Sequence, residues 1–259
     1  MSEEKEMTFW DHLEELRWSL MRIAGALLAA MILCFIFIPK VFDTFVLGPT
    51  TSDFFLYRWL RSILPAGGAS WLTNDSFYVD IININVASQF MTHLSTSFYF
   101  ALVLVFPYLI YEMWKFLKPA LFPEEERSVG FAFVFGTVMF FLGCALGYSI
   151  VFPLTFRFLT QYQLSQDVVN QISLNSYMHN FTMLIFVMGI VFELPLLTWL
   201  LSKLGIVTKA FLRQYRKHAV VVLLVLAAFI TPSGDPFTLM VVFLPLFLLY
   251  ELGIKLAVK

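Results

Sequence analysis

Residues 129–152 read VGFAFVFGTVMFFLGCALGYSIVF, a run of 24 residues without a charged side chain. A helix needs about 20 consecutive apolar residues to cross the roughly 30 Å hydrocarbon core of a bilayer. The alternation of polar and apolar residues that a membrane barrel strand requires is absent. Hydrocarbon also offers no partner for an unpaired backbone amide or carbonyl, so the backbone must satisfy itself. The run therefore predicts a transmembrane helix.

Similar runs recur along the chain, which is 59% hydrophobic and only 14% charged. A soluble domain is typically about 45–50% apolar and about 25% charged. We therefore expect an all-α polytopic membrane protein that forms a single membrane domain over residues 1–259. The expected spans lie near residues 18–38, 93–115, 129–152, 179–201, 218–231 and 237–254.

Lys and Arg are distributed unequally between the two sides of this arrangement. The amino-terminal segment, the second and fourth connections and the tail hold 13 of the 17 basic residues. Basic residues favour the cytoplasmic side, so we expect both termini to be cytoplasmic. The first 17 residues hold six acidic side chains, which argues against a cleavable signal peptide. The other side carries only Lys40, Arg58, Arg61 and Arg157.

The first connection, residues 39–92, is the longest extramembrane segment. Its stretch FFLYRWLRSIL (54–64) has the aromatic and basic pattern of an interfacial amphipathic helix. The stretch FYVDIININV (77–86) alternates in a way that predicts a short extended segment. A segment of this size cannot bury a substantial core of its own. We expect a periplasmic cap rather than a separate domain.

The spans differ in length and in packing features. Gly143 and Gly147 form a small-xxx-small pair, which lets two helix backbones approach closely. About 14 residues separate His218 from the TPSGDPF turn, which corresponds to about 21 Å of helix, and the last span is also short before Glu251 appears. We expect helices five and six to fall short of a full bilayer. Prolines in or beside the spans predict bent helices in a cupped arrangement: Pro107, Pro153, Pro195 and Pro245.

Motifs that carry common enzyme chemistry are absent from the sequence. It contains no GxxxxGK[ST] phosphate loop, no GxGxxG, no HExxH and no GxSxG. A net charge of −1 does not support nucleic-acid binding. The four histidines are scattered and predict no metal site, while Cys34 and Cys144 lie in apolar runs and predict packing rather than a disulfide or zinc site. We expect no catalysis, no cofactor and no bound metal.

Glu193 is conspicuous because it lies inside the apolar stretch GIVFELPLL. A charge at the centre of a membrane costs about 2.5–3.5 kcal/mol or more. The residue is either a hydrogen-bonded carboxyl that stabilises packing or an intramembrane polar site that contacts another segment. Glu112 and Glu251 lie nearer the cytoplasmic ends of their spans, where we expect solvated carboxylates.

Acidic residues also cluster where the membrane meets the cytoplasm. Carboxylates there can accept bidentate hydrogen bonds from a guanidinium, which favours a basic ligand lying at the interface. The alternative is a solvated acidic face, or pairing with Arg17 and Arg127. The clusters are Asp11, Glu14 and Glu15 before the first span, and Glu124, Glu125 and Glu126 after the second.

Six ordered motifs resemble those of the TatC family, the largest core subunit of the twin-arginine protein translocase. The resemblance covers essentially the full length, and the order and spacing of the motifs make it specific. The motifs are HLEELR (12–17), LGP ending at Pro49, YEMWKFLKPALFPEEER (111–127), FPLTFRFL from Phe152, FELP from Phe192 and ITPSGDPF from Ile230.

The resemblance implies a multi-pass receptor of the bacterial inner membrane that is not an enzyme. It implies binding of twin-arginine signal peptides and export of folded proteins with TatA- and TatB-type single-span partners, driven by the proton-motive force. Self-association is also implied. The signal-peptide site that it implies comprises Glu15, Leu16, Arg17, Phe116, Pro119 and a loop glutamate, for which Glu125 ranks before Glu126.

The same resemblance assigns roles to residues in the later spans. Glu193 matches the intramembrane glutamate of the family, Thr231 and Asp235 match the turn near which single-span partners bind, and Pro49 belongs to the periplasmic structure. The chain departs from the family in two places. Leu239 stands where the family often has Gln, and the first periplasmic loop is longer than usual.

Two other functions compete with this interpretation. A secondary transporter would use Glu193 as its proton or ion site. Such a transporter predicts internal repeat symmetry, and the two halves of the sequence show none. The third alternative is a scaffold protein without a recognition site.

Overall fold

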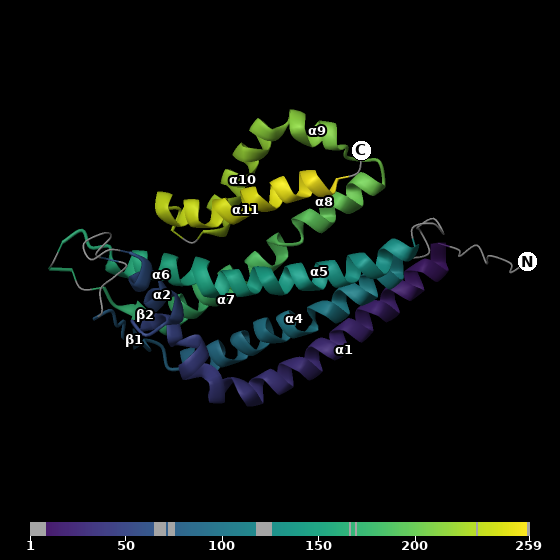
Figure 1. Cartoon of the computed structure of the whole chain (residues 1–259). Coiled ribbons are helices and arrows are strands. Elements are labelled where there is room, and N and C mark those ends of the chain that lie inside the picture. The colour runs from purple at the N-terminus through teal and green to yellow at the C-terminus, as the bar shows by residue number, and fades with distance from the viewer. Residues whose placement is uncertain are drawn as a thin grey trace, which may run out of the picture.

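The structure is a computed structural model that describes residues 9–64, 71, 76–117, 126–165, 167–168, 170–231 and 233–257. Long helices run side by side, and short segments gather at one end, which we call the cap end (Figure 1). The opposite end, where α1 begins, is the amino-terminal end. The elements are α1 (Phe9–Val41), η1 (Phe42–Val46), η2 (Gly48–Thr50), α2 (Phe55–Ile63), β1 (Ile81–Ile82), α4 (Ser88–Leu117), α5 (Glu126–Leu146), η5 (Gly147–Val151), α6 (Phe152–Gln161), β2 (Ile172–Ser173), α7 (Leu174–Val191), α8 (Leu194–Lys203), α9 (Lys209–Gln214), α10 (Arg216–Ile230) and α11 (Pro236–Leu256).

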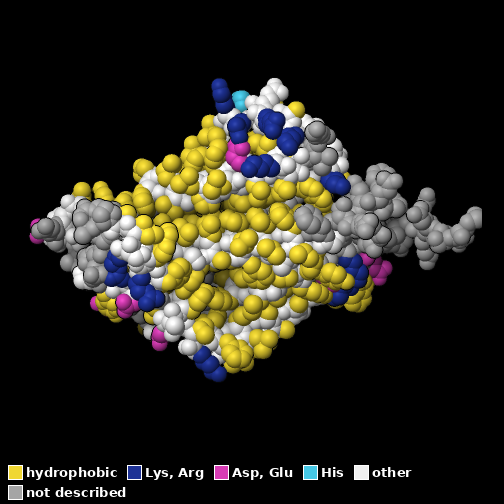
Figure 2. Space-filling model, viewed as in Figure 1, with side chains coloured by type: hydrophobic (Ala, Val, Ile, Leu, Met, Phe, Trp, Pro, Cys, Tyr) yellow, Lys and Arg dark blue, Asp and Glu magenta, His cyan; other side chains and the backbone are white. Residues whose placement is uncertain are grey.

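Five helical segments in the described part of the chain are long and apolar enough to cross a membrane. Figure 2 shows apolar side chains covering the middle of the visible face, with Lys and Arg gathered near its edges. An apolar belt between charged edges is what contact with lipid requires. The predicted all-α polytopic membrane fold is confirmed. The five segments are Leu13–Thr50, Ser88–Phe116, Ala132–Gln161, Leu174–Lys203 and Pro236–Leu256.

The hairpin of α10 and α11 agrees with the prediction in one helix only. α10 has 15 residues, about 22 Å of helix, so it is as short as the sequence predicted for the fifth crossing. α11 has 21 residues, about 31 Å, so the prediction of a short sixth helix is wrong. The helix continues past Glu251 to Leu256, and Arg216 of α10 pairs with that carboxylate, with Nε donating to Oε1 at 2.6 Å.

The close contact of α5 with α7 lies at the centre of the helix layers (Figure 1). A Cβ added at Gly143 would lie 2.5 Å from the carbonyl oxygen of Met188, and one at Gly147 would lie 3.0 Å from the Cα of Ile185. Gly189 of α7 approaches α5 in the same way. The two backbones can approach this closely only because no side chain separates them. The predicted role of the Gly143 and Gly147 pair is confirmed.

The remaining long helices are arranged around this pair. α4 packs on both α5 and α7, and α1 packs on α4 (Figure 1). On the other side, α8 diverges from α7 and packs against α11. Gly253 of α11 allows this contact, because a Cβ there would lie 3.1 Å from the hydroxyl oxygen of Thr198. α1 is thus the outer helix on its side of the molecule and has α4 as its main helix contact (Figure 1).

The proline positions explain where two spans change direction. Pro153 lies in the first turn of α6 and Pro195 in the first turn of α8. Proline is favoured in a first turn, where the missing N–H has no helical partner to lose. Pro107 and Pro245 lie inside α4 and α11. Two of the four prolines therefore mark helix starts within a span rather than bends of a continuous helix.

The cap is built on the ends of the long helices. β1 pairs in parallel with β2, and α2 forms where the sequence predicted an amphipathic helix. The side chains of Phe54 and Tyr57 share one buried cluster with Phe152 and Tyr177 of the helices below. The Tyr57 hydroxyl donates to the carbonyl oxygen of Pro153 at 2.9 Å. The cap thus shares its core with α6 and α7.

Arg157 of α6 is buried beneath the cap. Its guanidinium carbon lies 4.5 Å from the ring centroid of Tyr57 and 4.6 Å from that of Phe77. Its Nε donates to the carbonyl oxygen of Trp71 at 2.8 Å. Cation–π contacts strengthen when they are removed from water. Arg157 therefore links two cap segments to α6.

The glycine contact yields the first prediction. Replacing Gly143 with Ala should lower the unfolding free energy in detergent by roughly 1–3 kcal/mol, because the new methyl group meets backbone that must move. Gly130→Ala is the matched control on the same helix, since a Cβ there has nothing within 4 Å. Thermal unfolding of the two purified variants measures the difference. Equal melting temperatures would contradict the close contact.

Candidate functional site

The first turns of α1 carry three residues of the implied signal-peptide site. Glu15 and Leu16 are half-buried and Arg17 is exposed. The Arg17 guanidinium lies over the ring of Trp18, 5.8 Å from its centroid. Phe116 is half-buried in the last turn of α4, and Figure 1 places that turn at the amino-terminal end, near the start of α1.

The rest of the implied site falls on the connection between α4 and α5. Pro119 and Glu125 lie outside the described residues. α5 begins at Glu126, whose side chain also lies outside the description. The structure therefore brings the start of α1, the end of α4 and the start of α5 to one end of the molecule, and the carboxylates of the loop stay a prediction.

A shallow hollow of about 430 Å³ lies on the surface of α1 beside these residues. Its wall is apolar except for Arg17. A cation next to an apolar hollow suits a ligand that joins polar and apolar parts. The residues that line it are Leu13, Leu16, Arg17, Leu20, Met21 and Ala24.

An ion pair links α1 to α4 one to two turns deeper. Arg22 donates to Glu112 through Nε at 2.9 Å and through Nη2 at 2.7 Å, so the contact is bidentate. The Tyr108 hydroxyl donates to the same carboxylate at 2.8 Å, and Nη2 of Arg22 also donates to Ser19 at 2.9 Å. The Glu112 side chain is only 3% exposed. This cluster holds the first turns of α1 against the end of α4.

The expectation that Glu112 is a solvated carboxylate is therefore wrong. The residue faces α1, where Arg22 and Tyr108 replace the hydration that burial removes. The sequence contains a signal that could have found the pair. Arg22 and Glu112 have opposite charges and lie at similar depths from the same membrane surface in consecutive spans.

Glu193 lies in the break between α7 and α8, where the backbone leaves one helix and enters the next. Both carboxylate oxygens are buried and accept no hydrogen bond from any residue that the structure describes. Gly136 of α5 leaves room for the carboxylate, because a Cβ there would lie 3.1 Å from Oε2. Buried carboxylates are normally hydrogen-bonded. The two Glu193 oxygens are thus an exception to this rule within the described part of the chain.

The turn between α10 and α11 has an internal structural role. Asp235 caps α11, because its Oδ1 accepts a hydrogen bond from the Thr238 N–H at 2.8 Å and its Oδ2 accepts one from Ser233. Partial burial opposes ionisation, but these bonds outweigh it and hold the pKa of the Asp235 carboxyl below its ordinary value. Thr231 is buried at the end of α10. The structure therefore accounts for Asp235 as a helix cap.

Three further predicted residues have structural surroundings. Pro49 is buried in the cap, and its carbonyl oxygen lies 3.2 Å from the Tyr57 hydroxyl. Cys34 and Cys144 are both buried, in separate apolar clusters. Their predicted packing role is confirmed.

The apolar belt and the five apolar helical segments that the described residues form define a multi-pass membrane protein. The model of the family described as Sec-independent protein translocase protein (TatC) matches residues 11–245. The chain belongs to the TatC family. That family comprises protein translocase components and is not known for catalysis.

Individual relatives agree with the family assignment. A TatC of Blattabacterium sp. subsp. Periplaneta americana is 35% identical over 99% of this chain and 97% of the relative. A TatC of Deinococcus radiodurans is 31% identical over 96% of this chain and 84% of the relative. A crystal structure of the twin-arginine translocase receptor TatC in DDM superposes with a TM-score of 0.76 at 26% identity, covering 96% of this chain and all of that one.

The buried ion pair yields the second prediction. Arg22→Met leaves the Glu112 carboxylate buried without its guanidinium and should lower the unfolding free energy, because the buried charge then has no counter-charge. The double variant Arg22→Met with Glu112→Leu should recover most of the loss, since no charge is left unpaired. Denaturation in detergent measures both.

The matched control is Arg216→Met at the more exposed pair with Glu251. Arg216→Met should lower the unfolding free energy less than Arg22→Met does, because solvent screens the more exposed pair. An Arg22→Met variant as stable as Arg216→Met would contradict the burial of the first pair.

Proposed function

We propose that this chain is the membrane receptor of a twin-arginine translocation system, in the bacterial inner membrane. It binds signal peptides with paired arginines at the cytoplasmic, amino-terminal end of α1 and at the loop between α4 and α5. The proposal rests on one observation: Glu15, the apolar hollow around Leu16, the end of α4 and the start of α5 all lie at the amino-terminal end of the molecule.

The chemistry of this end suits a peptide with two arginines. Glu15 and the loop glutamates, Glu125 before Glu126, supply carboxylates that a planar guanidinium can bind in a bidentate manner. Lysine has a point charge and lacks this fork, so the site discriminates between the two cations by geometry. Phe116 and Pro119 add apolar surface beside the loop.

The apolar hollow on α1 suits the second part of a signal peptide. Such peptides place an apolar stretch after a basic one. With the arginines on the carboxylates, the apolar stretch continues along Leu16, Leu20 and Met21 towards the membrane. The Arg22–Glu112 pair keeps this part of α1 in place on α4. One peptide can therefore contact both parts of the site.

The receptor acts with partner proteins rather than alone. A folded cargo needs a wide opening in the membrane. The other parts of this opening come from TatA- and TatB-type single-span proteins and from further copies of the chain. Glu193 is the intramembrane contact for such a helix, because its buried oxygens accept no bond from the described residues. Thr231 and the turn at Asp235 form a second, separate part of the partner surface, with Asp235 capping the start of α11.

The energy for transport comes from the proton-motive force. The sequence contains no phosphate-binding loop of the GxxxxGK[ST] type, so nucleotide hydrolysis has no place in the chain. Moving one charge across 100 mV supplies about 2.3 kcal/mol. The proton gradient thus supplies the free energy that drives export of a folded cargo.

The arginine site yields the third prediction. Glu125→Gln should weaken binding of a twin-arginine peptide at least about tenfold, because a charge-assisted hydrogen bond contributes about 1.5–3 kcal/mol. A twin-lysine peptide should bind weakly to the unchanged protein and respond little to the variant. Fluorescence anisotropy with labelled peptides on protein in nanodiscs measures all four affinities.

Glu124→Gln is the matched control, since it removes one neighbouring charge from the same loop. Glu126→Gln tests the second-ranked carboxylate. Binding that falls equally in all three variants would indicate only a diffuse acidic surface, and equal binding of the two peptides would refute arginine recognition.

Glu193 yields the fourth prediction. Glu193→Leu should reduce co-purification of a TatA- or TatB-type partner several-fold and leave twin-arginine peptide affinity unchanged, since the two sites lie on different elements. Glu193→Gln keeps hydrogen bonding and should retain part of the association. A variant that retains its full partner complement would remove Glu193 from the contact.

A further inference from the structure

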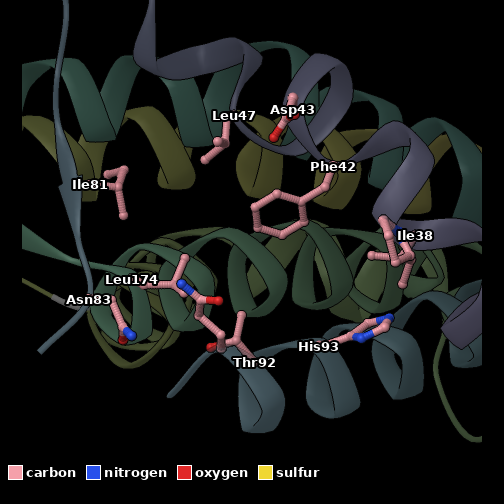
Figure 3. A pocket seen from close by; sticks show the side chains of 11 residues that line it. Ile38, Phe42, Asp43, Leu47, Ile81, Asn83, Thr92, His93 and Leu174 are labelled. Atoms are coloured by element: carbon pink, nitrogen blue, oxygen red, sulfur yellow. The ribbon is translucent and has the colours of Figure 1, made fainter. Parts of the chain in front are cut away.

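A pocket of about 400 Å³ lies at the cap end, far along α1 from Glu15. Its walls come from the end of α1, from η1, from β1 with the residues after it, and from the first turns of α4 and α7 (Figure 3). This volume is in the range of sites that hold small molecules, about 300–1,000 Å³. None of the roles assigned above uses it.

The pocket combines an apolar interior with a polar rim. Ile38, Phe42 and Leu47 contribute apolar wall, and Figure 3 shows the Phe42 ring between Asp43 above and Thr92 below. Asp43 supplies the one carboxylate among the lining residues. A ligand here meets apolar surface on one side and a negative charge on the other.

The polar lining residues divide into two groups. Thr92 donates to the Oδ1 of Asn175 at 3.2 Å, and Nε2 of His93 lies 2.8 Å from the carbonyl oxygen of Phe35, so both are already engaged. Asp43, Asn83 and Gln89 line the same pocket and form no hydrogen bond or ion pair with residues in the described ranges. The rim thus presents a carboxylate and two amides whose hydrogen-bonding capacity is free.

The position of the pocket restricts what can enter it. It lies near the end of the apolar segment Leu13–Thr50 and the start of the apolar segment Ser88–Phe116. The ends of membrane-spanning segments lie at the depth of the lipid headgroups. The neighbouring side chains of Phe37 and Phe90 are exposed, as expected for contact with acyl chains. An amphiphile already in the bilayer reaches this pocket without leaving the membrane surface.

We propose that this pocket binds the headgroup of an aminophospholipid, phosphatidylethanolamine, whose primary ammonium donates hydrogen bonds to Asp43 while its phosphate and ester oxygens accept hydrogen bonds from the side-chain amides of Asn83 and Gln89. The ammonium supplies the positive charge and the N–H donors that the Asp43 carboxylate lacks in the described structure, and side-chain amides are donors suited to phosphate oxygens. The ethanolamine methylenes pack on Phe42. A choline headgroup carries no N–H donor and does not fit this pattern.

The bound lipid would stabilise the packing of α1 on α4. α1 has its main helix contact with α4, and the pocket lies between these two helices at the cap end. A ligand that binds only the folded protein stabilises it by mass action. The lipid therefore acts at the opposite end of the α1–α4 contact from the Arg22–Glu112 pair.

The test compares lipids that differ only in the amine. Purified full-length chain in detergent is incubated with phosphatidylethanolamine, its N,N-dimethyl derivative or phosphatidylcholine of the same acyl chains, and bound lipid is counted by native mass spectrometry. We expect phosphatidylethanolamine to be retained about tenfold better than phosphatidylcholine, because only its ammonium can donate a charge-assisted hydrogen bond to Asp43. The dimethyl lipid should lie between them.

Asp43→Asn should reduce this preference to twofold or less. Asp53→Asn is the matched control, because Asp53 is an exposed carboxylate of the same cap outside the pocket lining, and it should leave the preference unchanged. Leu47→Trp fills the pocket with all charges kept and should also abolish retention. Monodisperse gel filtration of each variant establishes that it is folded.

Equal retention of phosphatidylethanolamine and phosphatidylcholine would overturn the proposal. So would an unchanged preference in folded Asp43→Asn, or an equal loss in Asp53→Asn. Preferential retention of phosphatidylglycerol would assign the pocket to anionic lipid and contradict the role of Asp43.

Discussion

The close contact between α5 and α7 is the constraint on which the rest of the structure depends. Inside hydrocarbon, helices gain little from apolar burial alone, so contact at van der Waals distance must hold them together. Gly143, Gly147 and Gly189 make that contact available. α4 packs on the resulting pair, α1 packs on α4, and α8 carries α11 on the other side. The end of α7 beside this contact also places Glu193 next to Gly136.

Much of this architecture could be predicted from the sequence. Length and apolarity locate the long helices, because hydrocarbon leaves a backbone few alternatives. The glycine pair predicts a close approach of two helix backbones without identifying α7 as the partner, and the short interval after His218 predicts a short α10. The length of α11 was not predicted, because a charged residue near the end of an apolar run does not end a helix, and glutamate is a good helix former.

Contacts between distant segments account for most of what sequence reasoning missed. Glu112 looks like a solvated carboxylate until α1 brings Arg22 to within 2.7 Å of it. Asp43, Asn83 and Gln89 belong to one rim only because α4 and β1 converge on the end of α1. Residues adjacent in sequence, such as Glu15 to Arg17, were recognised from their motif, and the structure adds the hollow beside them.

The central claim is that the chain selects cargo by paired arginines. The most direct measurement is export of a folded fluorescent reporter in bacteria whose own TatC gene is deleted, complemented with this chain and its cognate single-span partners. Export should return for a reporter behind a twin-arginine signal and fail for the same reporter behind a twin-lysine signal. Equal export of the two reporters, or none of either with the chain present in the membrane, would contradict the account.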